Sequence, residues 1–289
     1  MQIVNRSRMN SVALETTLLI HGVPATSSRD LAHELAGIVD TQGAHPALVG
    51  VVAGKPTIGM TDTELDALLE APEVPKANTG NLGVYIRRGS HAATTVSTTM
   101  ELAQAAGVRV FATGGLGGVH TGYGEHWDVS ADLMAFTRFP VAVVTSGVKS
   151  ILDVVSTREA LETLGIPVVG YKTDSFPAFY LPESESGVDA RFDDPDELAD
   201  FVRFELARTS RGIVVANPIP SEHALDPEQW AQWLARAKER AEQSQSRGRA
   251  WTPSVLGAVH ELSQGATLRA NIELVKSNAA LAGQLAARL

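Results

Sequence analysis

Short apolar runs alternate along the chain with segments that place apolar residues at helical spacing. Ala47–Ala53, Val108–Ala112 and Val141–Thr145 are such runs, and continuous apolar runs are typical of parallel strands that are buried on both faces. Segments with a helical pattern, such as Ser150–Leu164, separate them. This alternation predicts an α/β fold: a single α/β/α sandwich domain over residues 1–289, with a mainly parallel sheet.

Some boundaries follow from capping signals and others from apolar patterns alone. Thr61 with Glu64 three residues later matches a capping box, and Asp194 before a proline predicts a helix start. Ser11–Ile20 is predicted to be one buried strand, and the small residues of Ala92–Ala106 predict one helix. Further predictions are a helix over Arg29–Thr41 capped by Ser28, a short helix capped by Ser130, and an irregular surface loop or lid over Ser175–Val188.

Charge and composition exclude several classes of protein. The chain has a formal net charge of −9 and no block rich in Lys and Arg, which argues against nucleic acid or an anionic membrane as its main partner. It contains no cysteine, so disulfides, thiolate nucleophiles and zinc–thiolate sites are excluded. No apolar run approaches the roughly 20 residues that span a bilayer. The N-terminus lacks the features of a signal peptide, so we expect a cytoplasmic protein without membrane partners.

Lys149 is the candidate reactive group. It follows Gly147, between an apolar strand and a predicted helix, and ligands of open α/β sheets bind at the carboxyl ends of strands. Near a helix N-terminus, the partial positive charge and burial both disfavour the ammonium form. A neutral lysine amine attacks an aldehyde or a sugar C1 and forms an imine. The alternative interpretation is a surface lysine on the first turn of a helix.

Asp128 and Asp132 are candidate metal ligands. They lie four residues apart, so both would face one way if the helix began early enough. Carboxylate oxygens suit Mg²⁺ or Mn²⁺, which commonly take one or two carboxylates and several waters. The alternative is that Asp128 belongs to a loop and Asp132 is a charge in the first turn of the helix.

Other residues carry weaker signals. Glu15 is a carboxylate among apolar strand residues, and burial would raise its pKa and suit a general acid, unless it faces water at a sheet edge. His21 and His120 flank glycines and are candidate proton carriers or ligands. The turn Gly114–Gly118 departs from the dinucleotide fingerprint, so a nicotinamide cofactor is rejected. It is either an ordinary turn or a close approach of backbone to a ligand.

Together these stretches resemble the pseudouridine-5′-phosphate glycosidase family, also called the indigoidine synthase A-like family. The segments that carry the resemblance run in order from about Ala13 to Ala287. They are ALETTLLIHGVP, ATTVSTTM, GVRVFATGGLGGVH, DVSADL, VKSILDV, GIPVVGY, FPAFY, VVANPIP and NIELVKSNAALA.

The resemblance implies a single α/β sandwich, assembled as a homotrimer, that reversibly cleaves the C–C bond between uracil C5 and C1′ of ribose 5-phosphate. Lys149 matches the lysine that opens the ribose and holds C1′ as an imine. Glu15 matches the carboxylate that moves protons at the base, and Asp128 matches a Mn²⁺-binding aspartate. The other matches imply substrate contacts: Lys76; Ser130 and Asp132 along the sugar phosphate; Val96 through its helix backbone; and Thr113, His120 and Asn271 near the nucleobase.

Departures from the family pattern lie on loops that could face the base. The family lysine matched by Lys76 is usually followed by Ser-Arg-Arg-Asp, which is absent here, and residues 121–127 include Tyr123, Glu125, His126 and Trp127. A paired asparagine near the C-terminus is replaced by Ser277-Asn278. A C–C glycosidic bond has no leaving oxygen to protonate, so the usual carboxylate pair of glycosidases is insufficient and an imine can serve as electron sink.

The first functional hypothesis is therefore a C-glycosynthase that joins ribose 5-phosphate to an aromatic acceptor, as in the biosynthesis of alnumycin-type polyketide antibiotics. The alternative is a pseudouridine-5′-phosphate glycosidase. A non-catalytic protein that binds sugar phosphates is a third hypothesis, and an aldolase with a lysine imine is a fourth that does not explain the resemblance over the whole chain.

Overall fold

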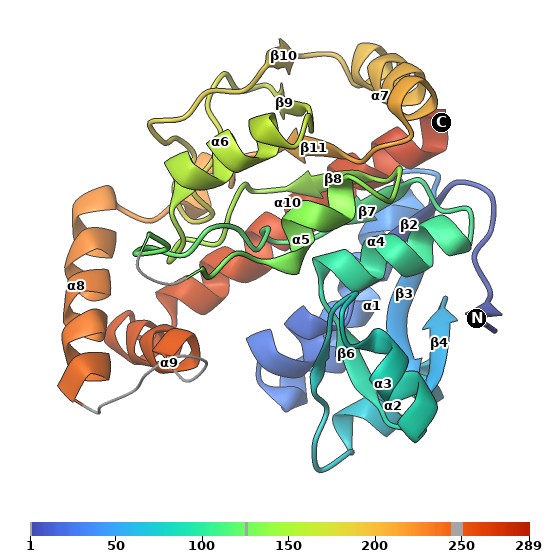
Figure 1. Cartoon of the computed structure of the whole chain (residues 1–289), viewed down its shortest axis with the longest axis horizontal. Coiled ribbons are helices and arrows are strands. Elements are labelled where there is room, and N and C mark those ends of the chain that lie inside the picture. Colours follow the sequence, from blue (N-terminus) through green and yellow to red (C-terminus); the bar gives the residue numbers. More distant parts are fainter. Residues whose placement is uncertain (1, 125–126, 244–250) are drawn as a thin grey trace.

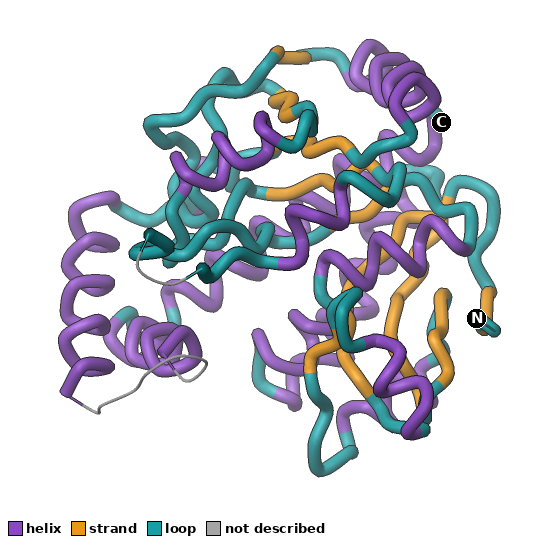
Figure 2. The backbone as a smooth tube through the Cα atoms, in the orientation of Figure 1, coloured by secondary structure: helices purple, strands orange, loops and turns teal. Residues whose placement is uncertain are grey.

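The computed structural model describes residues 2–124, 127–243 and 251–289, and within these ranges eleven strands form one sheet (Figure 1). Strands occupy the centre of the molecule and helices surround them (Figure 2). The strands are β1 (Val4–Asn5), β2 (Ser11–Glu15), β3 (His45–Val52), β4 (Lys55–Ile58), β5 (Lys76–Ala77), β6 (Ala92–Thr94), β7 (Val110–Ala112), β8 (Ala142–Thr145), β9 (Val168–Tyr171), β10 (Ala190–Phe192) and β11 (Ile213–Ala216). The α-helices are α1 (Ala25–Thr41), α2 (Asp62–Leu69), α3 (Leu82–Arg88), α4 (Val96–Ala105), α5 (Ala131–Phe136), α6 (Val154–Thr163), α7 (Pro195–Thr209), α8 (Pro227–Gln243), α9 (Trp251–Leu262) and α10 (Ala266–Arg288).

The strand order confirms the predicted α/β class and the mainly parallel sheet. Along the sheet the order is β1-β4-β3-β2-β7-β8-β11-β9-β10, and β6 and β5 branch from β3. Among the described pairs, only β3 with β4 and β3 with β6 run antiparallel. β2 lies near the middle, paired in parallel with β3 on one side and β7 on the other. The chain therefore begins at one edge of the sheet with β1 and enters its centre with the next strand, β2.

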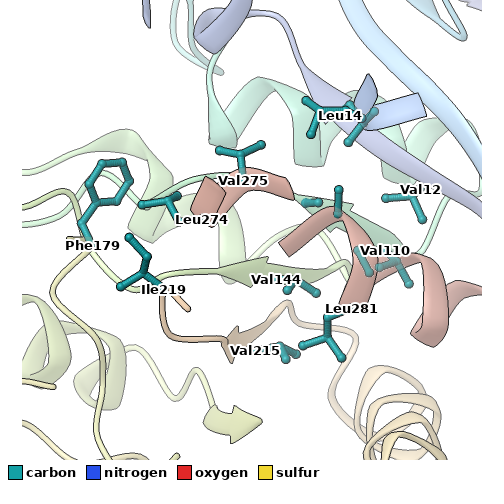
Figure 3. Close-up of a cluster of buried hydrophobic side chains, with 14 of the residues drawn as sticks. Val12, Leu14, Val110, Val144, Phe179, Val215, Ile219, Leu274, Val275 and Leu281 are labelled. Atoms are coloured by element: carbon teal, nitrogen blue, oxygen red, sulfur yellow. The ribbon is translucent and has the colours of Figure 1, made fainter. Parts of the chain in front are cut away.

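Successive residues of the central strands point to opposite faces of the sheet and so belong to two separate apolar layers. Val110 and Val144 face the layer that holds α1, α7 and α10, and Leu281 of α10 lies against them (Figure 3). Phe111 and Val143, the neighbours of those valines, belong to the opposite layer with α4, α5 and α6. Burial on both faces explains why these strands read as continuous apolar runs.

Three of the predicted capping signals, at Thr61, Ser130 and Asp194, mark helix starts correctly. The Thr61 hydroxyl oxygen accepts a hydrogen bond from the Glu64 amide, and the Glu64 carboxylate accepts one from the Thr61 amide, so the capping box of α2 is confirmed. Asp194 caps α7, with Pro195 at its first position, and Ser130 caps α5. None of the helices in the described ranges is long and apolar enough to cross a membrane.

The predicted strand Ser11–Ile20 is wrong in its second half. β2 ends at Glu15, and Leu18–Gly22 forms a π-helix. The Thr16 hydroxyl donates to the Val49 carbonyl at 3.0 Å, and the Thr17 hydroxyl donates to the Thr94 carbonyl at 2.6 Å. These side-chain bonds take the place of the backbone ladder and turn the chain. A short apolar run cannot by itself distinguish a strand from a helix.

Two helix starts also differ from the prediction. α1 begins at Ala25, and Ser28 is not its cap but a buried residue whose hydroxyl donates to the Leu19 carbonyl at 2.6 Å. The segment predicted as one helix over Ala92–Ala106 begins with the strand β6, which pairs with β3 and β5, before α4 starts at Val96. Small residues fit a crowded strand as well as a close helix contact, so their presence did not decide between the two.

Candidate active site

A cavity of about 530 Å³ opens at the carboxyl ends of β2, β7 and β8, the edge at which open α/β sheets bind ligands. Eight of the single residues predicted from the sequence line it: Glu15, His21, Lys76, His120, Ser130, Asp132, Lys149 and Asn271. The three other predicted residues, Val96, Thr113 and Asp128, are not on its wall.

Glu15 is the last residue of β2, and its carboxyl group enters the cavity wall. The Thr113 hydroxyl donates a hydrogen bond to Oε1. Oε2 is buried and has no hydrogen-bond partner. Desolvation raises the pKa of Glu15 above its usual 4.5, opposed by the positive charge of Lys149 and the hydrogen bond from Thr113. The carboxyl group is therefore suited to hold a proton that it can give to a substrate.

Lys149 lies on the cavity wall, but not at a helix N-terminus as the sequence suggested. α6 begins only at Val154, where the Asp153 carboxylate caps it by accepting from the Ser156 amide at 2.8 Å. The loop after β8 places Lys149 instead: its amide donates to the Leu116 carbonyl at 3.0 Å. Gly147, with φ of +82°, precedes it, and a Cβ there would meet the Pro177 carbonyl oxygen. A side chain at Gly147 would displace the turn that delivers the lysine.

Lys76 in β5 brings a second amine to the same cavity. Its side chain lines the cavity and is exposed to solvent. Partial desolvation there, together with the nearby charge of Lys149, lowers the pKa of Lys76, while Glu15 opposes this change. Two amines and one carboxyl group thus influence one another across the cavity, an arrangement that suits the binding of an anionic sugar phosphate.

Asp132 is buried, and its carboxylate joins two backbone segments. Oδ1 accepts from the Ser97 amide in the first turn of α4, and Oδ2 accepts from the Gly117 amide, both at 2.9 Å. Val96, predicted to lie where the helix backbone meets the ligand, is the first residue of α4 and has a fully buried side chain. Asp132 therefore fixes the glycine-rich loop to the start of α4.

The loop after β7 needs its glycines, because neighbouring protein atoms leave no room for a side chain. A Cβ at Gly115 would lie 2.5 Å from the Phe179 ring, and one at Gly118 would lie 2.3 Å from the Thr157 hydroxyl. The sequence offered an ordinary turn or a close approach of backbone to a ligand; the close approach seen here is to atoms of this chain, and contact with a ligand stays a prediction. The loop is thereby pressed against the wall of the cavity.

Gly117→Ala should destabilise the protein, because the new Cβ would lie 2.3 Å from the Ser130 hydroxyl oxygen and 2.6 Å from Asp132 Oδ2. We expect a loss of about 1–3 kcal/mol in the free energy of unfolding, measured in urea. Gly124→Ala is the matched control, because nothing lies within 4 Å of a Cβ there. Equal stability of the two variants would contradict this account of the loop.

Asp128 does not share a helix face with Asp132; the alternative interpretation, a loop Asp128 and an Asp132 in the first turn of the helix, is confirmed. α5 begins at Ala131, and Asp128 lies before it with 67% of its side chain exposed. Its nearest charged partner is His120, with Nδ1 3.8 Å from Oδ2. In the described part of the chain no group of three or more His, Cys, Asp or Glu side chains could hold a metal ion. Asp128 fits a metal only as a single protein ligand supplemented by water.

The loop between His120 and Asp128 was predicted to face the acceptor. Glu125 and His126 lie outside the described residues. Tyr123 and Trp127 are exposed, Trp127 by 86%, and neither lines the cavity. His21 does line it, and desolvation together with the charge of Lys76 lowers the pKa of its imidazole, so the ring stays neutral at physiological pH.

Sequence reasoning missed the apolar wall of the cavity. Leu18 comes from the π-helix, Leu256 from α9, and Phe179 and Tyr180 from the irregular loop after β9. The Phe179 and Tyr180 ring centroids are 4.7 Å apart, and Tyr180 stacks edgewise on Trp230 of α8 at 5.2 Å. Only the aromatic content of that loop signalled this role, since neither Leu18 nor Leu256 stands out from other apolar residues.

A model of the family described as "Indigoidine synthase A like protein" matches residues 3–288. The chain belongs to this family. Curated relatives named pseudouridine-5′-phosphate glycosidase include one from Symbiobacterium thermophilum, 43% identical over 283 residues, and one from Methylobacterium nodulans, 45% identical over 279 residues. Both alignments cover 96% of this chain, and they cover 92% and 83% of the two relatives.

Solved structures of the indigoidine synthase A-like family have the same fold. The prealnumycin C-glycosynthase AlnA, crystallised in complex with ribulose 5-phosphate, superposes with a TM-score of 0.90 at 33% identity, covering 96% of this chain and 91% of AlnA. An indigoidine synthase A-like protein from Thermotoga maritima gives a TM-score of 0.89 at 33% identity, covering 98% and 95%. The resemblance stated from the sequence motifs is therefore confirmed.

Proposed function

We propose that the protein is a pseudouridine-5′-phosphate glycosidase, which reversibly cleaves the C–C bond between uracil C5 and C1′ of ribose 5-phosphate. The observation that carries this proposal is that Lys149 and Glu15, an amine and a carboxyl group with a raised pKa, line one cavity. The 43–45% identity to relatives of that name over 96% of the chain supports the same reaction.

This proposal reverses the preference drawn from the sequence alone. The preferred hypothesis, a C-glycosynthase for a larger aromatic acceptor, rested on loop residues such as Tyr123 and Trp127, which do not line the cavity. AlnA, a C-glycosynthase, is 33% identical, less than the named glycosidases. The C-glycosynthase reaction is kept as a second candidate because of the apolar wall formed by Leu18, Phe179 and Leu256, which would suit a bulkier ring.

In the direction of cleavage, the Lys149 amine attacks C1′ and displaces O4′, so that the ribose opens and O4′ takes up a proton. Glu15 then gives a proton to C5 of uracil as the C1′–C5 bond breaks, and the bonding electrons stay with C5. C1′ is left as an imine with Lys149, because the lysine nitrogen supplies the electrons for the new double bond. Water adds to the imine carbon, the C1′–N bond then breaks as the nitrogen takes up a proton, and ribose 5-phosphate leaves as the aldehyde while the Lys149 amine is restored.

The other residues on the wall are proposed to bind the two halves of the substrate. Lys76, Ser130 and the loop that Asp132 holds would bind the sugar phosphate, and AlnA, with its bound ribulose 5-phosphate, supports a substrate of that type. Asn271 and His120 would contact the base. Thr113 would act through its hydrogen bond to Glu15. Assembly as a homotrimer remains a proposal drawn from the family.

Mn²⁺ is proposed as a cofactor, with Asp128 as its ligand from the protein. When bound, the ion would supply positive charge that favours the binding of an anionic sugar phosphate. Asp128→Ala should abolish the response of turnover to added Mn²⁺ and lower activity roughly tenfold or more. Asp40→Ala is the matched control. Asp40 forms a similar exposed pair with His45, with 4.0 Å between Oδ1 and Nδ1, and neither residue lines the cavity. An unchanged Mn²⁺ titration in Asp128→Ala would place the metal elsewhere.

Incubation with uracil, ribose 5-phosphate and Mn²⁺ tests the proposed function. Formation of pseudouridine 5′-phosphate, detected by mass spectrometry, is the expected result. If ribose 5-phosphate forms a borohydride-stable adduct but uracil gives no product, the second candidate with another aromatic acceptor is favoured. If neither adduct nor product forms, the enzyme hypotheses fail and a binding protein for sugar phosphates remains.

A further inference from the structure

Asn278 of α10 is fully buried beneath the carboxyl ends of the central strands and does not line the cavity. Its Nδ2 donates to the backbone carbonyl of Thr113 at 2.8 Å and to the Ser146 hydroxyl at 3.1 Å. Its Oδ1 accepts from Asn217 Nδ2 at 2.9 Å. One amide therefore connects the segments that follow β7, β8 and β11.

The orientation of this amide is fixed by its partners. A backbone carbonyl can only accept, so the atom that faces Thr113 must be the Asn278 nitrogen. The Asn217 nitrogen, which also donates to the Ser277 hydroxyl at 3.0 Å, must then face the Asn278 oxygen. In this arrangement Nδ2 uses both of its hydrogens, and no donor on Asn278 is free to serve a substrate.

One branch of this network ends at the candidate acid. Asn278 holds the Thr113 backbone, and the Thr113 hydroxyl donates to Glu15 Oε1. Oε2, the oxygen left without a partner, is the one available for proton transfer. The position of Thr113 therefore determines which carboxyl oxygen of Glu15 is engaged and which is free.

The second branch runs toward Lys149. The Ser146 hydroxyl accepts from Asn278, and the Ser146 carbonyl accepts from the Phe179 amide at 2.9 Å. Ser146 stands three residues before Lys149, in the turn that contains Gly147. Phe179 lies on the cavity wall. The same buried amide thus supports both sides of the cavity from underneath.

We propose that Asn278 is a positioning residue of the reaction: through Thr113 it sets the orientation of the Glu15 carboxyl group toward the carbon that accepts its proton. This inference rests on the proposed function. It also gives a role to the Ser277-Asn278 pair, a departure from the family pattern, because Ser277 anchors the Asn217 side chain that orients Asn278.

A double-mutant cycle tests this role, because residues that act through one another have non-additive effects. Asn278→Ala and Thr113→Val should each lower C–C turnover by roughly 10–100-fold, less than the 10²–10⁴-fold expected when the acid is removed, because the acid is misplaced and not lost. The double variant should be no slower than the slower single variant. Trapping of ribose 5-phosphate on Lys149 with borohydride should stay within about twofold of wild type, because imine formation does not need Glu15.

The pH profile supplies a readout that a purely structural role would not change. Thr113 lowers the pKa of Glu15 by donating a hydrogen bond to its carboxyl group. Loss of that bond should raise this pKa, so the limb of the pH–rate profile that is assigned to Glu15 should move to higher pH. Lys149, Asp132 and Lys76 are the charged groups that face Glu15, and they are the same in every variant. Asn278→Ala should therefore shift this limb in the same direction as Thr113→Val.

Leu281→Ala is the control, because it removes a buried side chain from α10 without touching Thr113. It should lower stability and leave the pH profile in place. If Asn278→Ala does not fold, Asn278→Leu keeps a branched side chain and removes the donor without adding a charge, and the same results are expected. Suppose that the wild type makes product. Additive effects of the two substitutions, or a pH limb that does not shift, would then overturn this inference but not the proposed function. Wild-type protein without adduct or product would overturn the proposed function and this inference together.

Discussion

Lys149→Arg should abolish the borohydride-trapped adduct with ribose 5-phosphate and lower C–C turnover by on the order of 10⁴-fold or more. A guanidinium keeps the positive charge near Glu15 but cannot form the imine at neutral pH, because arginine stays protonated. Mass spectrometry of the trapped protein, followed by peptide mapping, locates the adduct.

Lys172→Arg is the matched control for this prediction. Lys172 is exposed, lies over the Tyr171 ring at 5.0 Å and does not line the cavity. Trapping and turnover should both be unchanged. An adduct that survives in Lys149→Arg, for example on Lys76, would mean that the wrong amine has been identified.

Glu15→Gln should separate the two stages of the reaction. The sugar adduct on Lys149 should persist, because the imine forms at C1′ without the carboxyl group. C–C turnover should fall about 10²–10⁴-fold, the usual contribution of a general acid or base. Quantifying adduct and product in the same samples checks this prediction, and wild-type turnover in the variant would refute the acid–base role of Glu15.

The same substitution should change the dependence of stability on pH. Because desolvation raises the pKa of Glu15 above 4.5 in the folded protein, the folded state binds its proton more tightly than the unfolded state does. The stability of the wild type relative to Glu15→Gln should therefore be greatest below pH 4.5, fall as pH rises through the raised pKa, and stay constant above it. Urea unfolding over this range measures the difference.

Glu101→Gln is a control for this effect. Burial also raises the pKa of Glu101, but the residue lies in α4 and does not line the cavity. It should show the same sign of change in stability with pH and no loss of turnover. If Glu15→Gln gained no stability relative to the wild type at neutral pH, the carboxyl group would not be desolvated in the folded protein.

Features with a local cause could be predicted from the sequence. The capping box at Thr61 and the Asp194-Pro195 start of α7 depend on neighbours in the chain, and both are as predicted. The π-helix at Leu18–Gly22 was not predicted, because hydrogen bonds from Thr16 and Thr17 to distant carbonyls decide where β2 ends. The strand β6 likewise depends on partners far away in the sequence.

The residues of the candidate site likewise divide into those that local sequence could indicate and those whose role depends on distant parts of the chain. The residues around Lys149 made it a candidate, and the family resemblance matched it to the reactive lysine. Its environment was misjudged, because the extent of a loop between a strand and a helix is not set by local pattern. Asp132 was recognised as important but not as the link between Ser97 and Gly117. Asn278 could not be assigned a role at all, because its partners become neighbours only after the sheet is complete.

β2 and α10, from opposite ends of the chain, lie side by side (Figure 1), and each contributes a residue to the cavity wall, Glu15 and Asn271. Glu15 takes its place only when β2 is inserted between β3 and β7, and Thr113 is held only when Asn278 of α10 has docked. Contacts between residues so far apart in sequence are slow to form during folding. In a refolding experiment, catalytic competence should thus return after most of the helical signal, which makes enzyme activity an indicator that the last tertiary contacts have closed.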